Sequence, residues 1–525
     1  MPSTPTTKSQ VQAYQFVLRR MQSALVRKDA VMLHDPMRTH SRATIVGVCL
    51  AAIGMVGFII WGLFDPEPSL PSEGGIVIAQ PSGQVYVVSG DPKTLTPTFN
   101  LASARLWLLA QDQKQNQGGA AGPSSGGLKG GEPTVIKDDQ LKDVKKNRLT
   151  GIPYGPTLLP SDSQRPSDNW AVCDETQVNR DLPVGNPGRA NRIQTTVLAG
   201  VTNLGQELGG NQALLVTAEN ERSYLVYRTP STANSPAANA VKAEVDLDDA
   251  QVVSALDLSR STPRTISSGL LNAIPEVRGL SVPQIDGANQ ASNAGVEDFP
   301  VGQVFSVERA GKGQTYYVVL QNGIQEIKQS TANLLRFANT VGGGEIRKVR
   351  EDVISPVQRV NGFDESTYPD VVPDVLEPDS DSNSATACLG WTVTGQEGNQ
   401  KPKTQLFVGL TVPEKDRLVQ MSTPSPDGER IDFFYMTPGR AAVVRGASSE
   451  NAFGTGPLYL ISDLGVKFGI PDSSTAEALG LGTQRPAPDA IVSLLPNGAS
   501  LNTRDVQQSF DTVPQPRGQF PGAGQ

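Results

Sequence analysis

The longest apolar stretch of the chain runs from Ala43 to Phe64 and contains no charged residue. As a helix rising about 1.5 Å per residue it would measure roughly 33 Å, enough to cross a hydrocarbon core of about 30 Å. A buried core helix and a signal peptide are the alternatives, but the apolar region of a signal peptide is shorter, at about 7–15 residues. The pattern therefore predicts one membrane-spanning helix that begins at Ala43 and ends at Phe64.

Charges flanking this stretch predict its orientation. Residues 1–42 carry seven Lys or Arg and two acidic residues, whereas Asp65, Glu67 and Glu73 follow the stretch and the first downstream base is Lys93. Positive flanks stay on the cytoplasmic side of a membrane. We therefore expect a single-pass protein of the cell inner membrane, with residues 1–42 cytoplasmic and residues 65–525 exported.

The N-terminal segment has an amphipathic helical pattern over roughly residues 9–33. Its apolar residues recur at spacings of three and four, which places them on one helical face. A segment of 42 residues has no core that could bury this face, so it either lies on the membrane surface or packs on a partner. We favour a partner, with a docking helix made of Val11, Tyr14, Phe16, Leu18, Arg19, Arg20, Met21 and Leu25.

The exported region contains a weak internal repeat of alternating strands followed by a short helix. A Tyr stands in the strand of each copy, and repeats of this size indicate modules that pack on their neighbours. Three copies begin at Gly83, Gly313 and Gly456, with Tyr86, Tyr316 and Tyr459 as the matching residues, and Ser223-Tyr224-Leu-Val226 starts a more divergent copy. A chance resemblance among α/β elements is the alternative.

Cys173 and Cys388 are the two cysteines outside the apolar stretch, and each has a Trp three residues away, Trp170 or Trp391. An isolated pair in an oxidising compartment indicates a disulfide. Two free buried thiols are the alternative. A bridge would bring two distant segments into one central core.

Composition supports several small, turn-rich domains. The 525 residues include 52 Gly and 40 Pro but only 6% aromatics, and 38% are hydrophobic, which is enough for folded cores. The predicted boundaries are 1–42 cytoplasmic helix, 43–64 span, 65–110 repeat module, 111–135 Gly-rich flexible insertion, 136–200 central core, 201–300 and 301–360 repeat modules, 361–435 central core, 436–505 repeat module and 506–525 disordered tail.

Motifs for chemistry are absent or incomplete. The closest approach to a P-loop, residues 122–129, has Leu128 where the motif needs Lys, and residues 342–348 fail as well. Asp379-Ser-Asp381-Ser-Asn383 begins like a calcium loop, but Ser384 and Gly390 stand where that loop needs Gly and Glu. The two histidines, His34 and His40, both precede the span. We expect no catalytic, cofactor-binding or metal-binding residue.

Three pieces of the chain, in order, resemble EccB, the single-pass subunit of the mycobacterial type VII secretion machinery. The pieces are Thr6–Met21 with Met32–Pro36, the apolar span, and Tyr86 with Asn100–Leu106. The resemblance extends over essentially the whole chain, including Cys173 and Cys388, although the Gly-rich insertion departs from it. It implies a membrane complex with EccC, EccD and EccE, in which EccC carries the secretion ATPase.

The resemblance also implies an α+β fold: a single transmembrane helix plus an elongated exported domain of small repeat modules around a disulfide-linked core, which assembles with copies of itself. Its repeats are said to resemble a cell-wall-binding subunit of a phage lysin, so peptidoglycan is a further candidate partner beside membrane lipid; no nucleic-acid partner is expected. We therefore expect a structural subunit of the type VII complex. ATP hydrolysis, a label often given to this family, and a cell-wall anchor are the alternatives. ATP would be a cofactor only under the first alternative.

Overall fold

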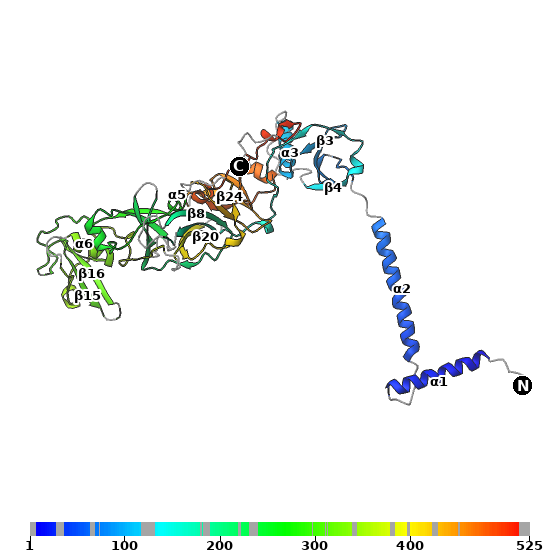
Figure 1. The fold of residues 1–525 in the computed structure, drawn as a ribbon, viewed down its shortest axis with the longest axis horizontal. Helices are drawn as coiled ribbons and strands as arrows, with labels where there is room; N and C mark the ends of the chain where they lie inside the picture. Colours follow the sequence, from blue (N-terminus) through cyan, green and yellow to red (C-terminus); the bar gives the residue numbers. More distant parts are fainter. Residues whose placement is uncertain are drawn as a thin grey trace. The chain divides into compact units, whose positions relative to one another are not determined.

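The computed structural model describes the following parts of the chain: residues 7–27, 36–63, 69–72, 74–116, 132–178, 181, 190–218, 222–229, 240–296, 298–309, 311, 313–338, 344–378, 384–395, 400–422, 429–449 and 452–513. The chain divides into two compact units, residues 1–69 and residues 70–525. The first unit is helical and the second is built mainly of β-sheets (Figure 1).

Two helices make up the described part of the first unit, α1 (Lys8–Arg27) and α2 (Pro36–Leu63). The apolar window Arg42–Gly62 lies within α2 and has a mean hydropathy of 2.5. By length and composition it is the one helix in the described ranges that could cross a membrane. Ala43 lies inside this window, whereas Phe64 and residues 28–35 lie outside the described residues.

Four sheets of the second unit share one topology. Each has three consecutive antiparallel strands, a helix, and a fourth strand that pairs parallel with the first, which gives the spatial order third, second, first, fourth. The first module comprises β1 (Gly75–Gln80), β2 (Val85–Ser89), β3 (Thr94–Thr98), α3 (Leu101–Asn116) and β4 (Pro133–Lys137). The second comprises β10 (Gln212–Thr217), β11 (Ser223–Arg228), β12 (Ala240–Val245), α4 (Ala250–Ala255) and β13 (Arg264–Thr265).

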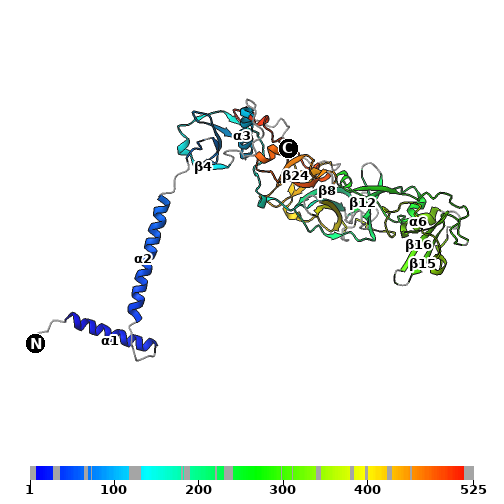
Figure 2. The ribbon, with the colours of Figure 1, turned by 180° about the vertical axis from the view of Figure 1, so that it is seen from behind.

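The third and fourth modules repeat this order. The third comprises β15 (Val304–Arg309), β16 (Gly313–Leu320), β17 (Gly323–Ile327), α6 (Gln329–Ala338) and β18 (Arg347–Lys348). The fourth comprises β24 (Ala441–Ala447), β25 (Leu458–Ser462), β26 (Lys467–Ile470), α8 (Ser473–Ala478) and β27 (Arg485–Pro488). In the third module α6 packs on β15 and β16, and it lies beside β16 in both ribbon views (Figure 2).

Each module continues with a second short helix and a segment that pairs parallel with its third strand. The second helices are η1 (Asp138–Leu141), α5 (Ser268–Ala273), α7 (Glu351–Ile354) and α9 (Asp489–Val492). The returning segments are β5 (Lys145–Lys146), β14 (Glu276–Leu280) and the single bridges at Arg359 and Asn497. Three further short strands join module sheets: β6 (Leu149–Thr150) and β28 (Ser509–Phe510) in the first, and β19 (Asp374–Val375) in the second.

A central sheet has the order β22-β23-β8-β7-β20-β21-β9. Its middle consists of two hairpins, β7 (Trp170–Val178) with β8 (Ala190–Ala199), and β20 (Thr386–Thr394) with β21 (Lys401–Gly409). The outer strands are β9 (Gln206–Glu207), β22 (Val419–Gln420) after η4 (Lys415–Arg417), and β23 (Phe433–Tyr435). The chain thus runs twice through the sequence module, hairpin, module, so the second unit is built from two similar halves.

Hydrophobic cores join the modules in pairs. The core around Leu106 and Leu479 connects α3 of the first module with α8 of the fourth. The core around Val252 and Leu334 connects α4 of the second with α6 of the third. The largest core, which includes Trp170, lies between the central sheet and the second and fourth modules, where α5 meets α9.

The predicted fold class is confirmed in its α+β composition, single candidate membrane helix, repeat modules and disulfide-linked core. Strand pairing aligns Tyr86 with Tyr317 and not with Tyr316. In the third module Arg359 of the returning segment pairs with Ile324, Ile324 pairs with Val319, and Tyr317 lies two residues before Val319. In the first module Lys146 pairs with Leu95, Leu95 pairs with Val88, and Tyr86 lies two residues before Val88. Strands β5 and β6 fall in the range 136–200 that we assigned to the central core, and they pair with β3 of the first module.

Candidate functional site

The predicted disulfide is present at the centre of the second unit. Cys173 on β7 lies directly opposite Cys388 on β20, with a Cα–Cα distance of 4.0 Å and a bond between the two sulfurs. Both cysteines are buried, and they join segments that are 215 residues apart in sequence. The bridge therefore links the hairpin of the first half to the hairpin of the second. Cys49 is free and exposed on α2.

The two tryptophans near these cysteines face each other on the opposite side of the sheet. Trp170 pairs with Trp391 in the same β7–β20 ladder. Successive side chains of a strand alternate between faces, so a spacing of three places each Trp on the face away from its Cys. Both Trp side chains are buried in the largest core, whereas the disulfide lies in a smaller core on the other face. The Trp and Cys pairs thus fix both faces of the central sheet.

A buried carboxylate connects the central sheet to the second module. Asp174 on β7 has no exposed surface. Its Oδ1 accepts hydrogen bonds from the hydroxyls of Thr195 and Ser267, both 2.9 Å long, and its Oδ2 accepts one of 2.7 Å from the backbone N–H of Ser267. The Ser267 hydroxyl also caps α5 by accepting from the backbone N–H of Leu270 at 3.0 Å. Asp174 therefore holds the start of α5 against β7 and β8.

A buried guanidinium balances this carboxylate. Arg264 on β13 donates to the carbonyl oxygens of Ser384 (2.8 Å) and Ala385 (3.1 Å), just before β20. Burial raises the pKa of Asp174 to about 6, although its hydrogen bonds and the charge of Arg264 act in the opposite direction. Burial likewise lowers the pKa of Arg264 to about 10. At neutral pH both groups are charged, so the pair couples the two hairpins to the second module.

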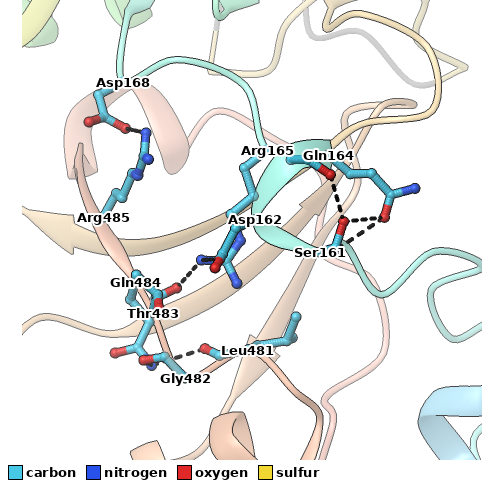
Figure 3. A network of polar contacts seen from close by, with 11 residues as sticks. Ser161, Asp162, Gln164, Arg165, Asp168, Leu481, Gly482, Thr483, Gln484 and Arg485 are labelled. Carbon is cyan, nitrogen blue, oxygen red and sulfur yellow. Dashed lines mark hydrogen bonds and ion pairs between the residues drawn. The ribbon is translucent and has the colours of Figure 1, made fainter. Parts of the chain in front are cut away.

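Arginines also clamp the segment between the first module and β7 onto the fourth module (Figure 3). Arg165, which follows η2 (Asp162–Gln164), is buried and donates through Nη1 to the carbonyl oxygen of Thr483 at 2.6 Å. Arg440 donates in turn to the carbonyl oxygen of Arg165 at 2.6 Å. Arg485 on β27 forms an ion pair of 2.9 Å with Asp168. These contacts tie residues 161–168 to the chain some 300 residues later.

A cation lies over a tyrosine ring in every module. In the second and fourth modules the cation is a buried Lys on the third strand, Lys242 over Tyr224 (5.6 Å) and Lys467 over Tyr459 (5.7 Å). Each of these lysines also donates to carbonyl oxygens at the end of the second helix: Lys242 to Leu271, and Lys467 to Val492 and Ser493. In the first and third modules the cations over the ring are Lys146 with Tyr86, and Arg309 and Arg359 with Tyr317.

The first module carries an open groove of about 510 Å³ beside α3. Trp107 and Gln111 of α3 line it, together with Asn147 and Arg148 before β6. Lys114 reaches across it and donates to the side-chain oxygen of Gln507 at 2.6 Å. The groove thus combines an indole, amides and basic groups, which can bind a polar ligand with a planar or apolar face.

The predicted docking helix is present as α1. Its apolar stripe is exposed along the whole helix, from Val11 (45% exposed) and Leu18 (38%) to Leu25 (81%). Phe16, Arg19 and Arg20 lie on the same helix and are exposed too. Within the described residues the stripe packs on nothing, so its role as a docking surface stays a prediction.

The motif-like segments add no chemical site within the described residues. The P-loop-like residues 122–129 and the calcium-loop-like residues 379–383 lie outside the described residues. Arg347 and Lys348, at the end of the second P-loop-like segment, form the exposed strand β18. In the described ranges, no three Asp, Glu, His or Cys side chains gather where they could hold a metal ion. Sequence patterns missed the Asp174–Arg264 pair and the arginine clamp, which join distant segments without a local signal.

One candidate membrane helix and a disulfide-linked body of repeated modules define a class: proteins with a single candidate membrane anchor and a modular, β-rich body. Residues 3–515 match the family model described as "Type VII secretion system ESX-1, transport TM domain B". The chain belongs to this family, the EccB family.

Relatives match along nearly the whole chain. The ESX-1 secretion system ATPase EccB1 of Mycolicibacterium smegmatis (strain MKD8) is 28% identical over 97% of this chain and 96% of its own length. The ESX-5 secretion system ATPase EccB5 of Mycobacterium tuberculosis (strain H37Rv) is 27% identical over 97% and 94%. Among solved structures, an intact ESX-5 inner membrane complex contains a chain that is 25% identical, with a TM-score of 0.63 over 98% of both chains. An EccB3 dimer from the ESX-3 core complex is 25% identical, with a TM-score of 0.64 over 83% of this chain and all of that one.

Proposed function

We propose that this chain is the EccB-type structural subunit of a type VII secretion complex in the inner membrane. The observation that carries the proposal is the likeness, in sequence and fold, of nearly the whole chain to a subunit of an intact ESX-5 inner membrane complex. In this role α2 anchors the protein in the membrane, and the modular body assembles the exported side of the channel. Self-association of that body is part of the proposal, and no cofactor is required.

The charge pattern supports an orientation with α1 in the cytoplasm. Arg19 and Arg20 lie on α1, and Arg42 lies at the start of the apolar window of α2. Basic residues favour the cytoplasmic side of a span. The exposed apolar stripe of α1 would then contact the membrane-embedded or cytoplasmic partners, for which EccC-, EccD- and EccE-type subunits are the candidates.

The docking role of α1 can be tested with Leu18→Ser and Met21→Ser together. The double variant should still insert through α2 but should be depleted from the large membrane complex, because the stripe loses its two central apolar side chains. The matched control is Gln12→Ser with Ala13→Ser, which introduces the same residues away from the stripe. The measurement is the amount of chain recovered with its co-purifying subunits from detergent-solubilised membranes. Wild-type recovery of the stripe variant with full secretion would make α1 a membrane-surface helix instead.

Subunit identification tests the function itself. The solubilised native complex should contain this chain together with EccC-, EccD- and EccE-type subunits, and deletion of the chain should abolish export by that system. Retention of export in the deletion strain would contradict the proposal.

ATP hydrolysis is the first alternative, because relatives carry the name ATPase. The purified full-length chain should show no ATP turnover above that of a heat-inactivated sample. The variant Lys129→Ala, in the P-loop-like segment, is the sharpest probe of this alternative. Robust turnover that this change abolishes would establish the enzyme and exclude a purely structural role.

A cell-wall anchor is the second alternative, and the groove beside α3 is the observation that favours it. An indole such as Trp107 stacks on sugar rings, and the amides of Gln111 and Asn147 can bond sugar hydroxyls. Pull-down of the full-length chain with insoluble peptidoglycan, compared between wild type and Trp107→Ala, tests this function. Binding that depends on Trp107 in a strain that secretes normally without the chain would favour the anchor.

A further inference from the structure

The four modules provide an internal comparison of how an open sheet edge is protected. An exposed edge carries unpaired backbone N–H and C=O groups that can pair with another chain, and proteins shield such edges with short strands, charge or proline. In every module the fourth strand is the equivalent edge. The four edges differ in how well they are protected.

Three of the four edges are protected. The edge strand β13 has two residues and lies beside β8 of the central sheet. The edge strand β18 also has two residues, and both are charged and exposed. The edge strand β27 carries Pro486 and Pro488, which lack the N–H groups that a neighbouring strand needs.

The fourth edge, β4 of the first module, is the least protected of the four. It has five residues, Pro-Thr-Val-Ile-Lys, with its one proline at the first position and its one charge at the last. Val135, at its centre, is 48% exposed, whereas Ile136 is buried in the module core. Strand β1 pairs with one side of β4, and within the described residues no strand pairs with the other (Figure 1).

We infer that β4 pairs antiparallel with β4 of a second copy of this chain, so that the first modules of two copies share one continuous sheet. This inference rests on the self-association included in the proposed function, and it names the surface. A second copy is the favoured occupant because a relative with the same fold over 83% of this chain was solved as a dimer.

The residues of β4 are compatible with two-fold pairing. A two-fold axis at Val135 places Val135 opposite Val135 of the second copy, and Lys137 opposite Pro133 of the second copy. No like charges then face each other across the strands, which would weaken the pairing. The two exposed valines bury each other, and Pro133, which has no N–H to donate, lies at the end of the paired segment.

A cysteine introduced at the axis tests this geometry. Directly opposite residues of an antiparallel pair have Cβ atoms about 4.5–5.5 Å apart, close to the spacing that a disulfide needs. In the full-length chain carrying Cys49→Ser, Val135→Cys should form an intermolecular disulfide under mild oxidation. The matched control is Val353→Cys, at another exposed valine (43%) on α7 of the third module. Absence of the cross-link at 135, or equal cross-linking at 353, would overturn the inference.

A charge at the same position tests the energetics. Val135→Lys places like charges opposite each other, so capture of an untagged copy by a tagged one should be lost from detergent-solubilised membranes. Val353→Lys should leave this capture unchanged, and an intact Cys173–Cys388 bridge in peptide maps shows that each variant is folded. If capture persists in Val135→Lys, the copies associate through another surface. The inference then fails, while the proposed function, which is judged by subunit composition and export, stands.

Discussion

At the scale of single residues, Asp174 is a carboxylate with no exposed surface. A carboxylate without exposed surface is costly unless donors and a cation surround it. Here two hydroxyls and a backbone N–H contact it, and Arg264 contributes the compensating charge. Since these groups come from β7, β8, β13 and the start of α5, their joint hydrogen bonding specifies how the second module sits on the central sheet.

The raised pKa of Asp174 makes the stability of the body depend on pH. An Asp has an ordinary pKa of 3.8, and burial raises that of Asp174 to about 6, so between these values the folded chain binds the proton more tightly than the unfolded chain. The contribution of Asp174 to the free energy of unfolding therefore falls by up to about 3 kcal/mol as pH rises from about 4 to about 6. Above about pH 6 this contribution is constant. Arg264 stays charged throughout this range.

The variant Asp174→Asn should lack this dependence. Denaturant unfolding at pH 4, 5, 6 and 7 measures the free energy of unfolding of both proteins. On acidification from pH 7 to pH 4 the wild type should gain stability relative to the variant, whatever the offset between them at pH 7. Parallel curves for the two proteins would contradict the assignment of this titration to Asp174.

The buried lysines allow a paired test. Lys467→Met keeps the aliphatic stem but leaves the carbonyl oxygens of Val492 and Ser493 without their charged donor, so it should lower the free energy of unfolding by about 1–3 kcal/mol. Lys242→Met should behave similarly because its site is equivalent. Thermal unfolding measures the effect, with Lys348→Met at an exposed lysine as the control. If neither change alters the free energy of unfolding, the cost of burying each ammonium group equals the stabilisation from its contacts.

At the scale of elements, the cysteine and tryptophan pattern predicted the centre of the fold, because a lone pair of cysteines with similar neighbours leaves one pairing. The repeats were predicted from their strands and tyrosines. The alignment of the third copy with the others was the weak point, because Tyr316 and Tyr317 are adjacent and either could match Tyr86. The bridge between Ile324 and Arg359 selects Tyr317, whose side chain lies on the face of the sheet that packs on the second helix, α7. Neither the second helices nor these two-residue or single-bridge segments have a local sequence signal of their own.

The disulfide should stabilise the central sheet strongly. Closing a loop of this length contributes on the order of 5 kcal/mol in the chain-entropy model, and removal of native disulfides typically costs about 2–5 kcal/mol. Cys173→Ser with Cys388→Ser should therefore lower the unfolding midpoint markedly, whereas Cys49→Ser on α2 should change it little. Circular dichroism during thermal unfolding measures both. An unchanged midpoint in the double variant would show that the paired hairpins are stable without the bridge.

At the scale of the whole second unit, no sequence pattern indicated which modules meet. The pairing of the first with the fourth and of the second with the third depends on complementary helix faces, such as α3 on α8, which composition does not reveal. The same holds for the clamp, in which Arg165 and Arg440 donate to backbone carbonyl oxygens and Arg485 pairs with the half-buried carboxylate of Asp168. Every residue has a backbone carbonyl oxygen, so a sequence does not show which of them accept a hydrogen bond from an arginine.

Loosening the clamp should expose the joint between the first and fourth modules. Arg165→Met removes the donor to the carbonyl oxygen of Thr483, a charge-assisted bond worth about 1.5–3 kcal/mol. Amide hydrogen exchange of residues 161–168 and 481–486 should become faster, while the central hairpins keep their protection. Arg260→Met, at an exposed arginine, is the control. Unchanged exchange in both segments would mean that the hydrophobic contacts of α3 and α8 alone close the joint.

The pairing of β6 with β28 has a consequence for the order in which the chain becomes native. Residues 149–150 bond to residues 509–510, and Leu501 and Val506 complete the core under α3. The chain is synthesised from its N-terminus, so the first module is made before the other three but acquires β28 only after all of them. A premature stop before residue 509 would therefore leave the module that is made first without its pairing partner for β6.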